Sequence, residues 1–178
     1  MTNFLDLCRH RQSCRNFSDR PVERAKLTRC VEAASLAPSG CNSQPWSFVV
    51  VDDPVLVPEV AKCAQPMEGM NAFASKARAF IVVLEEHAVL MPKIRIMLDS
   101  QYFAKGDLGA ATVCLCLEAA DQGLGTCILG MYNREKLCQL LDIPIEKRFG
   151  ALVAVGYPED ETIRPKTRKS FNDIVRYK

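Results

Sequence analysis

The chain has 178 residues, 48% of them apolar and 25% charged, which is the composition of a globular protein with a hydrophobic core, and we expect one domain over residues 1–178. The formal net charge of +2 gives no basic footprint for nucleic acid, and no apolar run approaches the roughly 20 residues that span a membrane. The N-terminal residues lack the basic and apolar regions of a signal peptide, so we predict a cytoplasmic protein.

Nine cysteines are spread along the chain, an odd number without any C-x-x-C pair. This spacing argues against a zinc or iron–sulfur site and against a secreted disulfide framework. Most of them lie among Ala, Val and Leu, so we interpret them as buried, reduced thiols and expect no metal site. Cys14 and Cys41 flank the polar segments described below and are candidates for oxidation. The two histidines, His10 and His87, have no partner pattern of a triad or metal centre.

The first predicted element is a helix over Asn3–Arg11, which runs into the basic stretch Arg9–Arg15. Such a cluster is commonly a solvated surface. It is alternatively an anion site, because Arg side chains hold a phosphate through paired N–H contacts. A second helix is predicted over Arg24–Leu36, where apolar residues recur at i, i+3, i+4 and i+7, and a β-like run follows at Phe48–Val51.

A polar loop, Ala37–Trp46, separates this helix from the strand and reads Ala-Pro-Ser-Gly-Cys-Asn-Ser-Gln-Pro-Trp. Pro38 and Pro45 exclude a continuing helix, and Gly40 is predicted to adopt the positive φ that brings backbone N–H groups close to a ligand. The hydroxyl and amide side chains of the loop both donate and accept hydrogen bonds. The loop is therefore either a helix-to-strand turn or a site for a flat, polar, mostly neutral ligand.

Helical and strand patterns alternate through the rest of the chain, and pattern alone predicts an alternating α/β fold. From Leu108 to Leu117 only Thr112 is polar, so this helix is expected to be buried on all sides, as a central helix or in a subunit interface. Gly123 and Gly125 are predicted to end it with positive φ. The predicted elements are helices at Pro54–Ala64, within Asp107–Gly130 and at Arg134–Leu141, and strands at Ala79–Glu85, Thr126–Gly130 and Phe149–Gly156.

Four segments, in the same order and across nearly the whole chain, resemble the nitroreductase family of FMN-dependent oxidoreductases. They are Arg-x-Ser-x-Arg-x-Phe at 11–17, Pro-Ser-x-x-Asn-x-Gln-Pro-Trp at 38–46, the apolar helix within 107–130, and the basic tail with Lys166 and Arg168. The resemblance implies an α+β fold, a mixed β-sheet flanked by helices, with a long buried helix at a homodimer interface. It also implies that the 38–46 loop reaches the FMN of the neighbouring subunit.

The resemblance further implies which residues bind FMN. Arg11 and Ser13 match positions at the phosphate and ribityl chain, and Gln12 stands where a basic residue or His is common. Arg15 matches a cation at the pyrimidine edge, where reduction places negative charge. The expected cofactor-binding residues are Arg11, Gln12, Ser13, Arg15, Pro38, Ser39, Gly40, Asn42, Gln44, Asn71, Leu129, Gly130, Lys166 and Arg168. No side chain is expected to be catalytic, because flavin N5 carries the chemistry.

The function implied is hydride transfer from NADH or NADPH through FMN to a small acceptor, such as a nitroaromatic, quinone or enone, in a ping-pong cycle. One alternative is a flavin-binding or flavin-storage protein without turnover. Others are reductive dehalogenation and oxygen-dependent flavin fragmentation; both need a dedicated lid, and the short segment 87–105 argues against them. No nucleic-acid or membrane partner is expected. The physiological acceptor and the preferred nicotinamide stay open.

Overall fold

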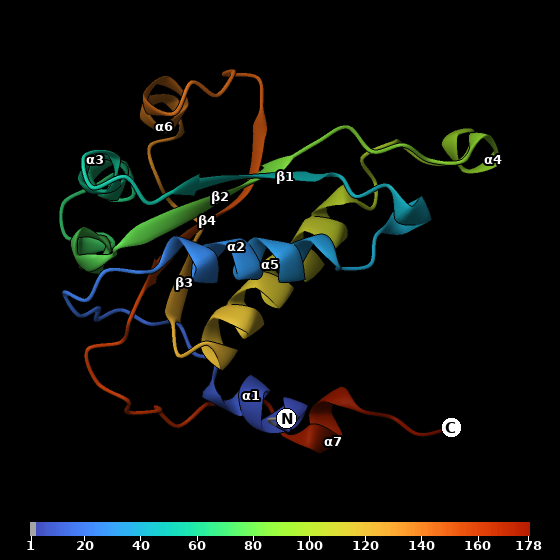
Figure 1. The fold of residues 1–178 in the computed structure, drawn as a ribbon. Helices are drawn as coiled ribbons and strands as arrows, with labels where there is room; N and C mark the ends of the chain where they lie inside the picture. The colour runs from blue at the N-terminus through green and yellow to red at the C-terminus, as the bar shows by residue number, and fades with distance from the viewer. Residues whose placement is uncertain (1–2) are drawn as a thin grey trace.

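The computed structural model describes residues 3–178, and a four-stranded sheet forms its centre (Figure 1). The strands are β1 (Trp46–Val51), β2 (Ala79–Glu85), β3 (Gly125–Leu129) and β4 (Arg148–Gly156), in the order β1-β2-β4-β3. All three neighbouring pairs are antiparallel. The α+β class is confirmed. The alternating α/β pattern is wrong, because that fold requires parallel neighbours.

The predicted mixed sheet needs a correction. Parallel pairing among the described residues is limited to a single bridge, which joins Ser13 to Thr126 of β3. All neighbouring strands run in opposite directions, so the sheet itself is antiparallel rather than mixed.

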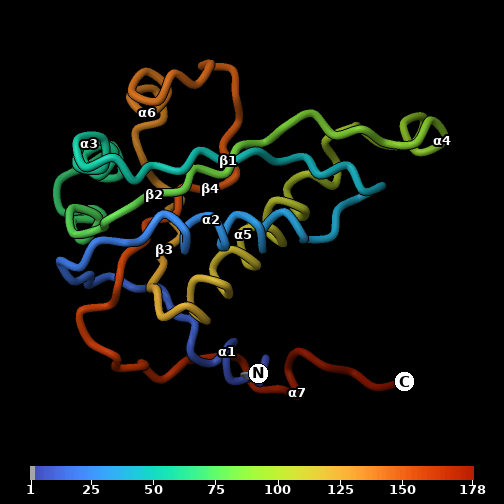
Figure 2. The backbone as a smooth tube through the Cα atoms, viewed as in Figure 1, coloured from blue at the N-terminus to red at the C-terminus, as the bar shows by residue number. Residues whose placement is uncertain are grey.

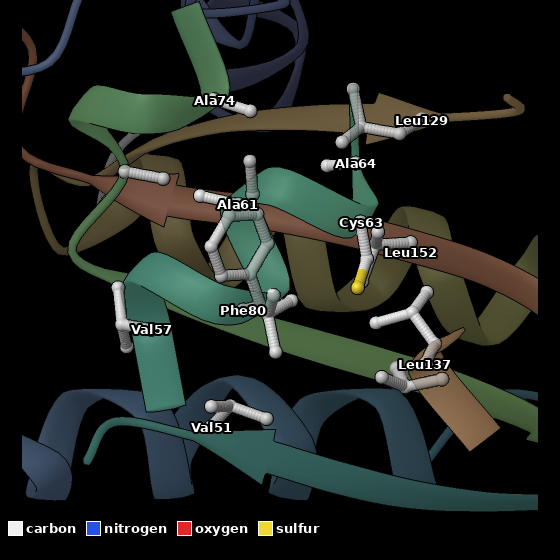
Figure 3. Packing of buried hydrophobic residues seen from close by; sticks show 14 of the residues in the cluster. Val51, Val57, Ala61, Cys63, Ala64, Ala74, Phe80, Leu129, Leu137 and Leu152 are labelled. Atoms are coloured by element: carbon white, nitrogen blue, oxygen red, sulfur yellow. The ribbon is translucent and has the colours of Figure 1, made fainter. Parts of the chain in front are cut away.

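Alternate residues of β2 supply the two layers of the core. Phe80, Val82 and Leu84 pack on the face covered by α3 (Leu56–Cys63), η2 (Ala72–Lys76) and α6 (Arg134–Leu140). Figure 3 shows the Phe80 ring among side chains of this layer. Ile81 and Val83 pack on the opposite face against α2 (Arg24–Ser35) and α5 (Ala104–Asp121). The strand is apolar from Ala79 to Leu84 because both of its faces are buried there.

Three short helices lie outside these layers. Helix α1 (Phe4–His10) begins at Asn3, whose side-chain oxygen accepts the Leu5 N–H at 3.0 Å. Helix α7 (Phe171–Ile174) lies in the C-terminal tail, and Figures 1 and 2 place it near α1. Helix α4 (Pro92–Arg95) projects away from the sheet. No helix in the described part of the chain has the length and apolar character to cross a bilayer.

The central part of α5, Leu108–Leu117, is apolar except for Thr112, but it is not buried on all sides within one chain. Leu108, Ala111 and Leu115 are buried against α2 and the sheet, whereas Gly109 is exposed and the Val113 side chain is 50% exposed. The expectation of burial on all sides is therefore wrong for the single chain. An apolar stripe therefore remains partly uncovered along the helix: Gly109 and Val113 are exposed, and Ala110 and Cys114 beside them are half-buried against the core.

The two glycines predicted to end α5 act differently. Gly123 has a φ of +76°, as expected for a residue just past a helix end. Gly125 does not have a positive φ; it begins β3, and a Cβ there would lie 2.7 Å from the Cβ of Cys14. Gly125 is therefore required by the close approach of the N-terminal segment to β3.

Candidate functional site

The basic stretch after α1 is held in an extended path along β3. The Cys14 N–H donates to the Thr126 carbonyl at 2.9 Å, next to the bridge between Ser13 and Thr126. The C-terminal tail returns to the same place, and the two segments together line a cavity of about 390 Å³. Six predicted site residues lie in its wall: Arg11, Gln12, Ser13, Arg15, Lys166 and Arg168.

This cavity is strongly positive. Its wall carries five cations, Arg11, Arg15, Arg164, Lys166 and Arg168, and no Asp or Glu. Within residues 3–178, none of the five forms an ion pair. Burial lowers the pKa of the Lys166 ammonium group, and the nearby charges of Arg11 and Arg168 lower it further. No acidic side chain of the wall therefore balances the charge of these five cations.

Lys166 also fastens the tail to the end of α1. Its Nζ donates to the carbonyl of Cys8 at 2.5 Å and to the carbonyl of Arg11 at 2.6 Å. Carbonyls at a helix C-terminus are unpaired and carry partial negative charge, so they suit an ammonium group.

Arg164 was missed by the sequence analysis. Its guanidinium Nη2 donates to the Ser13 carbonyl at 2.5 Å, which brings it into the cavity wall. A signal was present: Arg164, Lys166 and Arg168 are spaced two residues apart, and alternate residues of an extended chain point to one side.

A second group of predicted residues lies beside Arg15. The Arg15 guanidinium carbon lies 6.0 Å from the ring centre of Phe73. Asn71, with a φ of +53°, donates through Nδ2 to the carbonyls of Ala64 at 3.0 Å and Met131 at 3.1 Å. Both amide N–H groups of Asn71 are thus used within the chain, so only its side-chain carbonyl is left for a ligand.

The turn after β3 completes this group. The Leu129 side chain is buried in the core, which leaves only its backbone for a ligand, while Gly130 is exposed. The structure thus brings the Leu129–Met131 turn together with Asn71.

The polar loop contains the short helix η1 (Gly40–Asn42), and its geometry corrects one prediction. Positive φ values occur at Cys41 (+54°), Asn42 (+52°) and Gln44 (+49°), but not at Gly40. A Cβ on Gly40 would lie 2.9 Å from the Phe103 ring, so this glycine is required by close packing. All the site residues predicted for this loop lie within the one segment: Pro38, Ser39, Gly40, Asn42 and Gln44.

Two hydrogen bonds fix the shape of the loop from inside. The Ser39 Oγ accepts the Gln44 N–H at 2.9 Å, and the Gln44 side-chain amide donates to the Asn42 carbonyl at 3.2 Å. The loop does not reach the basic cavity of its own chain: Figures 1 and 2 show it at the far end of α5 from α1 and the tail.

A larger cavity of about 820 Å³ adjoins the basic one, since Arg11, Gln12, Arg15 and Arg164 line both. Its wall includes Tyr157, whose hydroxyl donates to Glu23 at 2.7 Å. This hydrogen bond is the main cause, with Arg20 a further one, that lowers the pKa of the Glu23 carboxyl to about 2. The cavity contains both acids and bases, so it has no single charge preference.

The nine cysteines are all free, and six of them are buried. Burial raises the pKa of the Cys14 thiol, which makes it a poor nucleophile, and Cys41 is half-buried in the polar loop. Among residues 3–178, no three His, Cys, Asp or Glu side chains gather as a metal site would require.

Comparison with known proteins gives consistent matches. A model of the nitroreductase family matches residues 8–157. A protein of Archaeoglobus fulgidus with a provisional name as an NADH dehydrogenase/NAD(P)H nitroreductase is 32% identical, over 90% of this chain and 88% of that protein. A 5,6-dimethylbenzimidazole synthase of Rhodospirillum rubrum is 28% identical, over 89% and 83%. The solved structure of a nitroreductase family protein from Streptococcus pneumoniae aligns with a TM-score of 0.83 at 25% identity, covering 99% of this chain and 100% of that one.

Proposed function

The chain belongs to the nitroreductase family, and we propose that it is an FMN-dependent oxidoreductase that takes hydride from NADH or NADPH and passes it to a small acceptor. In this proposal residues 1–178 form one FMN-binding domain that works as a homodimer. Nitroaromatics, quinones and enones are the acceptor classes to test.

The observation that carries the proposal is the basic cavity without acids. A phosphate monoester with two negative charges would balance several of its five cations, and guanidinium groups can bind it through paired N–H contacts. The cavity is formed by segments at opposite ends of the chain, so the fold itself gathers these charges. The residues present thus fit the phosphate end of FMN.

The neighbouring residues fit the flat end of the same molecule. Bound FMN would supply a carrier that accepts and donates hydride. Arg15 would hold a positive charge beside the pyrimidine edge of the ring, where reduction places negative charge. The exposed backbone at Gly130 and the side-chain carbonyl of Asn71 would contact the polar edge. The proposed site needs no side-chain acid or base.

A second copy of the chain is part of the proposal, for two reasons. The loop at 38–44 lies away from the basic cavity of its own chain, so it could contribute only to the site of a partner. The apolar stripe on α5 offers a surface for that partner, because a helix that is apolar all round is stable only when its remaining face is covered. The projecting segment around α4, with Met91, Ile96 and Met97 exposed, offers further apolar contact.

Steady-state oxidation of NADH and NADPH, with and without a quinone, tests the proposed activity. Oxidation that depends on the quinone supports it. Flavin binding without turnover of either nicotinamide would instead indicate a storage protein. Release of halide from a halogenated phenol would instead indicate reductive dehalogenation. Consumption of FMN with oxygen would indicate flavin fragmentation.

A further inference from the structure

The side chain of Gln12 connects the N-terminal segment to the C-terminal tail. Its Nε2 donates to the Thr162 carbonyl at 2.8 Å, across 150 residues of sequence. Its Oε1 accepts two N–H groups of Arg164, the backbone N–H at 3.3 Å and the guanidinium Nε–H at 3.1 Å. All three hydrogen bonds of this one amide go to the tail.

Besides Gln12, two side chains of the tail itself hold it at this point: Lys166 donates to the carbonyls at the end of α1, and Arg164 donates to the Ser13 carbonyl. Residues 161–170 form no helix or strand, and their side chains are mostly exposed. The tail and the N-terminal segment both bring cations to the cavity, and these like charges repel each other. Burial is the main cause that lowers the pKa of Lys166, and the charges of Arg11 and Arg168 lower it further. Hydrogen bonds to neutral acceptors, namely the Gln12 amide and backbone carbonyls of the N-terminal segment, hold the two positive segments together against this repulsion.

Resting on the proposed function, we infer that Gln12 is a positioning residue that holds the tail closed over the phosphate site, and that Arg164 is a specificity-determining contact for phosphorylated flavin. The Gln12 amide fits this role because it donates and accepts at once. Lys or Arg at this position would have no acceptor for Arg164 and would add a charge. Glu would lose the bond to Thr162 and would compete with the phosphate.

Arg164 has the geometry to contact the phosphate. Two of its five side-chain N–H groups bind Gln12 and Ser13, which fixes the plane of the guanidinium group. The remaining N–H groups belong to a side chain that lines the basic cavity. A guanidinium group held in place loses little rotamer freedom when it binds an anion, so its contribution to affinity is larger than that of a free surface Arg.

The test compares FMN with riboflavin, which lacks the phosphate, on the full chain. Arg164→Gln should raise the dissociation constant of FMN about tenfold and that of riboflavin about twofold or less, because one charge-assisted contact is lost. Gln12→Leu, which keeps the size of the side chain without its polar atoms, should also weaken FMN selectively. Lys169→Gln removes an exposed tail cation outside the cavity wall and is the matched control.

The double variant separates positioning from direct contact. If Gln12 holds Arg164 in place, Arg164→Gln should change FMN affinity much less in the Gln12→Leu background than in the native chain. Additive effects of the two substitutions, or equal losses for FMN and riboflavin, would overturn the inference.

Hydrogen exchange of residues 162–168, with inorganic phosphate as the probe, gives a readout that needs no flavin. Phosphate should slow exchange in the native chain and have little effect in Gln12→Leu. If neither flavin binds but phosphate protects the native tail, the proposed function fails, and with it the role of Arg164 toward phosphorylated flavin, whereas the positioning role of Gln12 at a phosphate site stands. If phosphate does not protect the native tail, the inference is wrong.

Discussion

The backbone N–H of Gly40 points at the carboxylate of Asp107, with the nitrogen 3.1 and 3.2 Å from the two oxygens. Asp107 lies in the first turn of α5, so the helix that carries the apolar stripe also fixes the polar loop. We predict that Asp107→Ala costs about 1–3 kcal/mol of unfolding free energy, because a partly buried N–H is left without an acceptor. Asp107→Asn keeps an acceptor and should cost less. Urea unfolding measures both, and equal losses would contradict this account.

Gly40→Ala tests the packing of the same loop. The added Cβ would lie 2.9–3.0 Å from side-chain atoms of Phe103, so we expect a loss of about 1–3 kcal/mol in unfolding free energy. Gly106→Ala is the control, because a Cβ there meets no atom within 4 Å and alanine favours the helix. Thermal unfolding of the two variants should shift in opposite directions, and an unchanged midpoint for Gly40→Ala would be evidence against the tight contact.

Salt dependence of FMN binding tests the charge of the basic cavity. Native affinity should fall as salt rises, because exposed charges are screened. Arg168→Gln should lower affinity at low salt and flatten the salt dependence, since it removes one of the five cations. Arg176→Gln, which changes a tail cation outside the cavity wall, should leave the slope unchanged. If FMN affinity depends on salt equally in the native chain and in Arg168→Gln, the phosphate of FMN does not bind in the basic cavity.

A charge on the apolar stripe of α5 tests the proposed dimer. Val113→Glu should give a monomer in analytical ultracentrifugation and lose FMN, because an unpaired carboxylate cannot be buried in an apolar interface without a large cost. Val55→Glu, at a side chain that is 74% exposed just before α3, is the control and should stay a dimer. A native chain that sediments as a monomer would contradict the dimer directly.

Alkaline pH should destabilise the fold through its buried thiols. Burial raises the pKa of the Cys30 thiol from its ordinary 9.0 to about 12. The unfolded chain therefore loses this proton first, so the stabilisation is present below about pH 9 and is lost as pH rises toward 12. Cys30→Ala should lose less unfolding free energy than the native chain between about pH 8 and about pH 10. If the unfolding free energies of the native chain and Cys30→Ala fall equally over this pH range, ionisation of the Cys30 thiol does not contribute to the alkaline loss of stability.

Much of the fold could be predicted from local patterns. Strand β2 occupies the predicted residues Ala79–Glu85, because a fully buried strand is a continuous apolar run. The direction of the strands could not be predicted, because helices between strands are typical of parallel sheets as well. The predicted positive φ of Gly40 was wrong. This glycine is needed for its contact with Phe103, 63 positions further on, and nothing in the local sequence indicates that contact.

Within the site, residues of recognisable chemistry were predicted and partners at long range were missed. The basic residues at 11–15 and 166–168 were found by charge and motif, and the structure gathers them in one cavity. The bond between Gln12 and Arg164 spans 152 residues, and nothing in the local sequence of either residue specifies the other. Such pairs become visible only when the chain is folded.

The absorbance spectrum of the purified protein, before and after addition of NADPH or NADH, tests the central claim most directly. We predict the near-ultraviolet and blue bands of an oxidised flavin, and their loss when the nicotinamide is added. Bands that persist with both nicotinamides would contradict the proposed reductase activity. A colourless protein that takes up no FMN on reconstitution would contradict the flavin site itself.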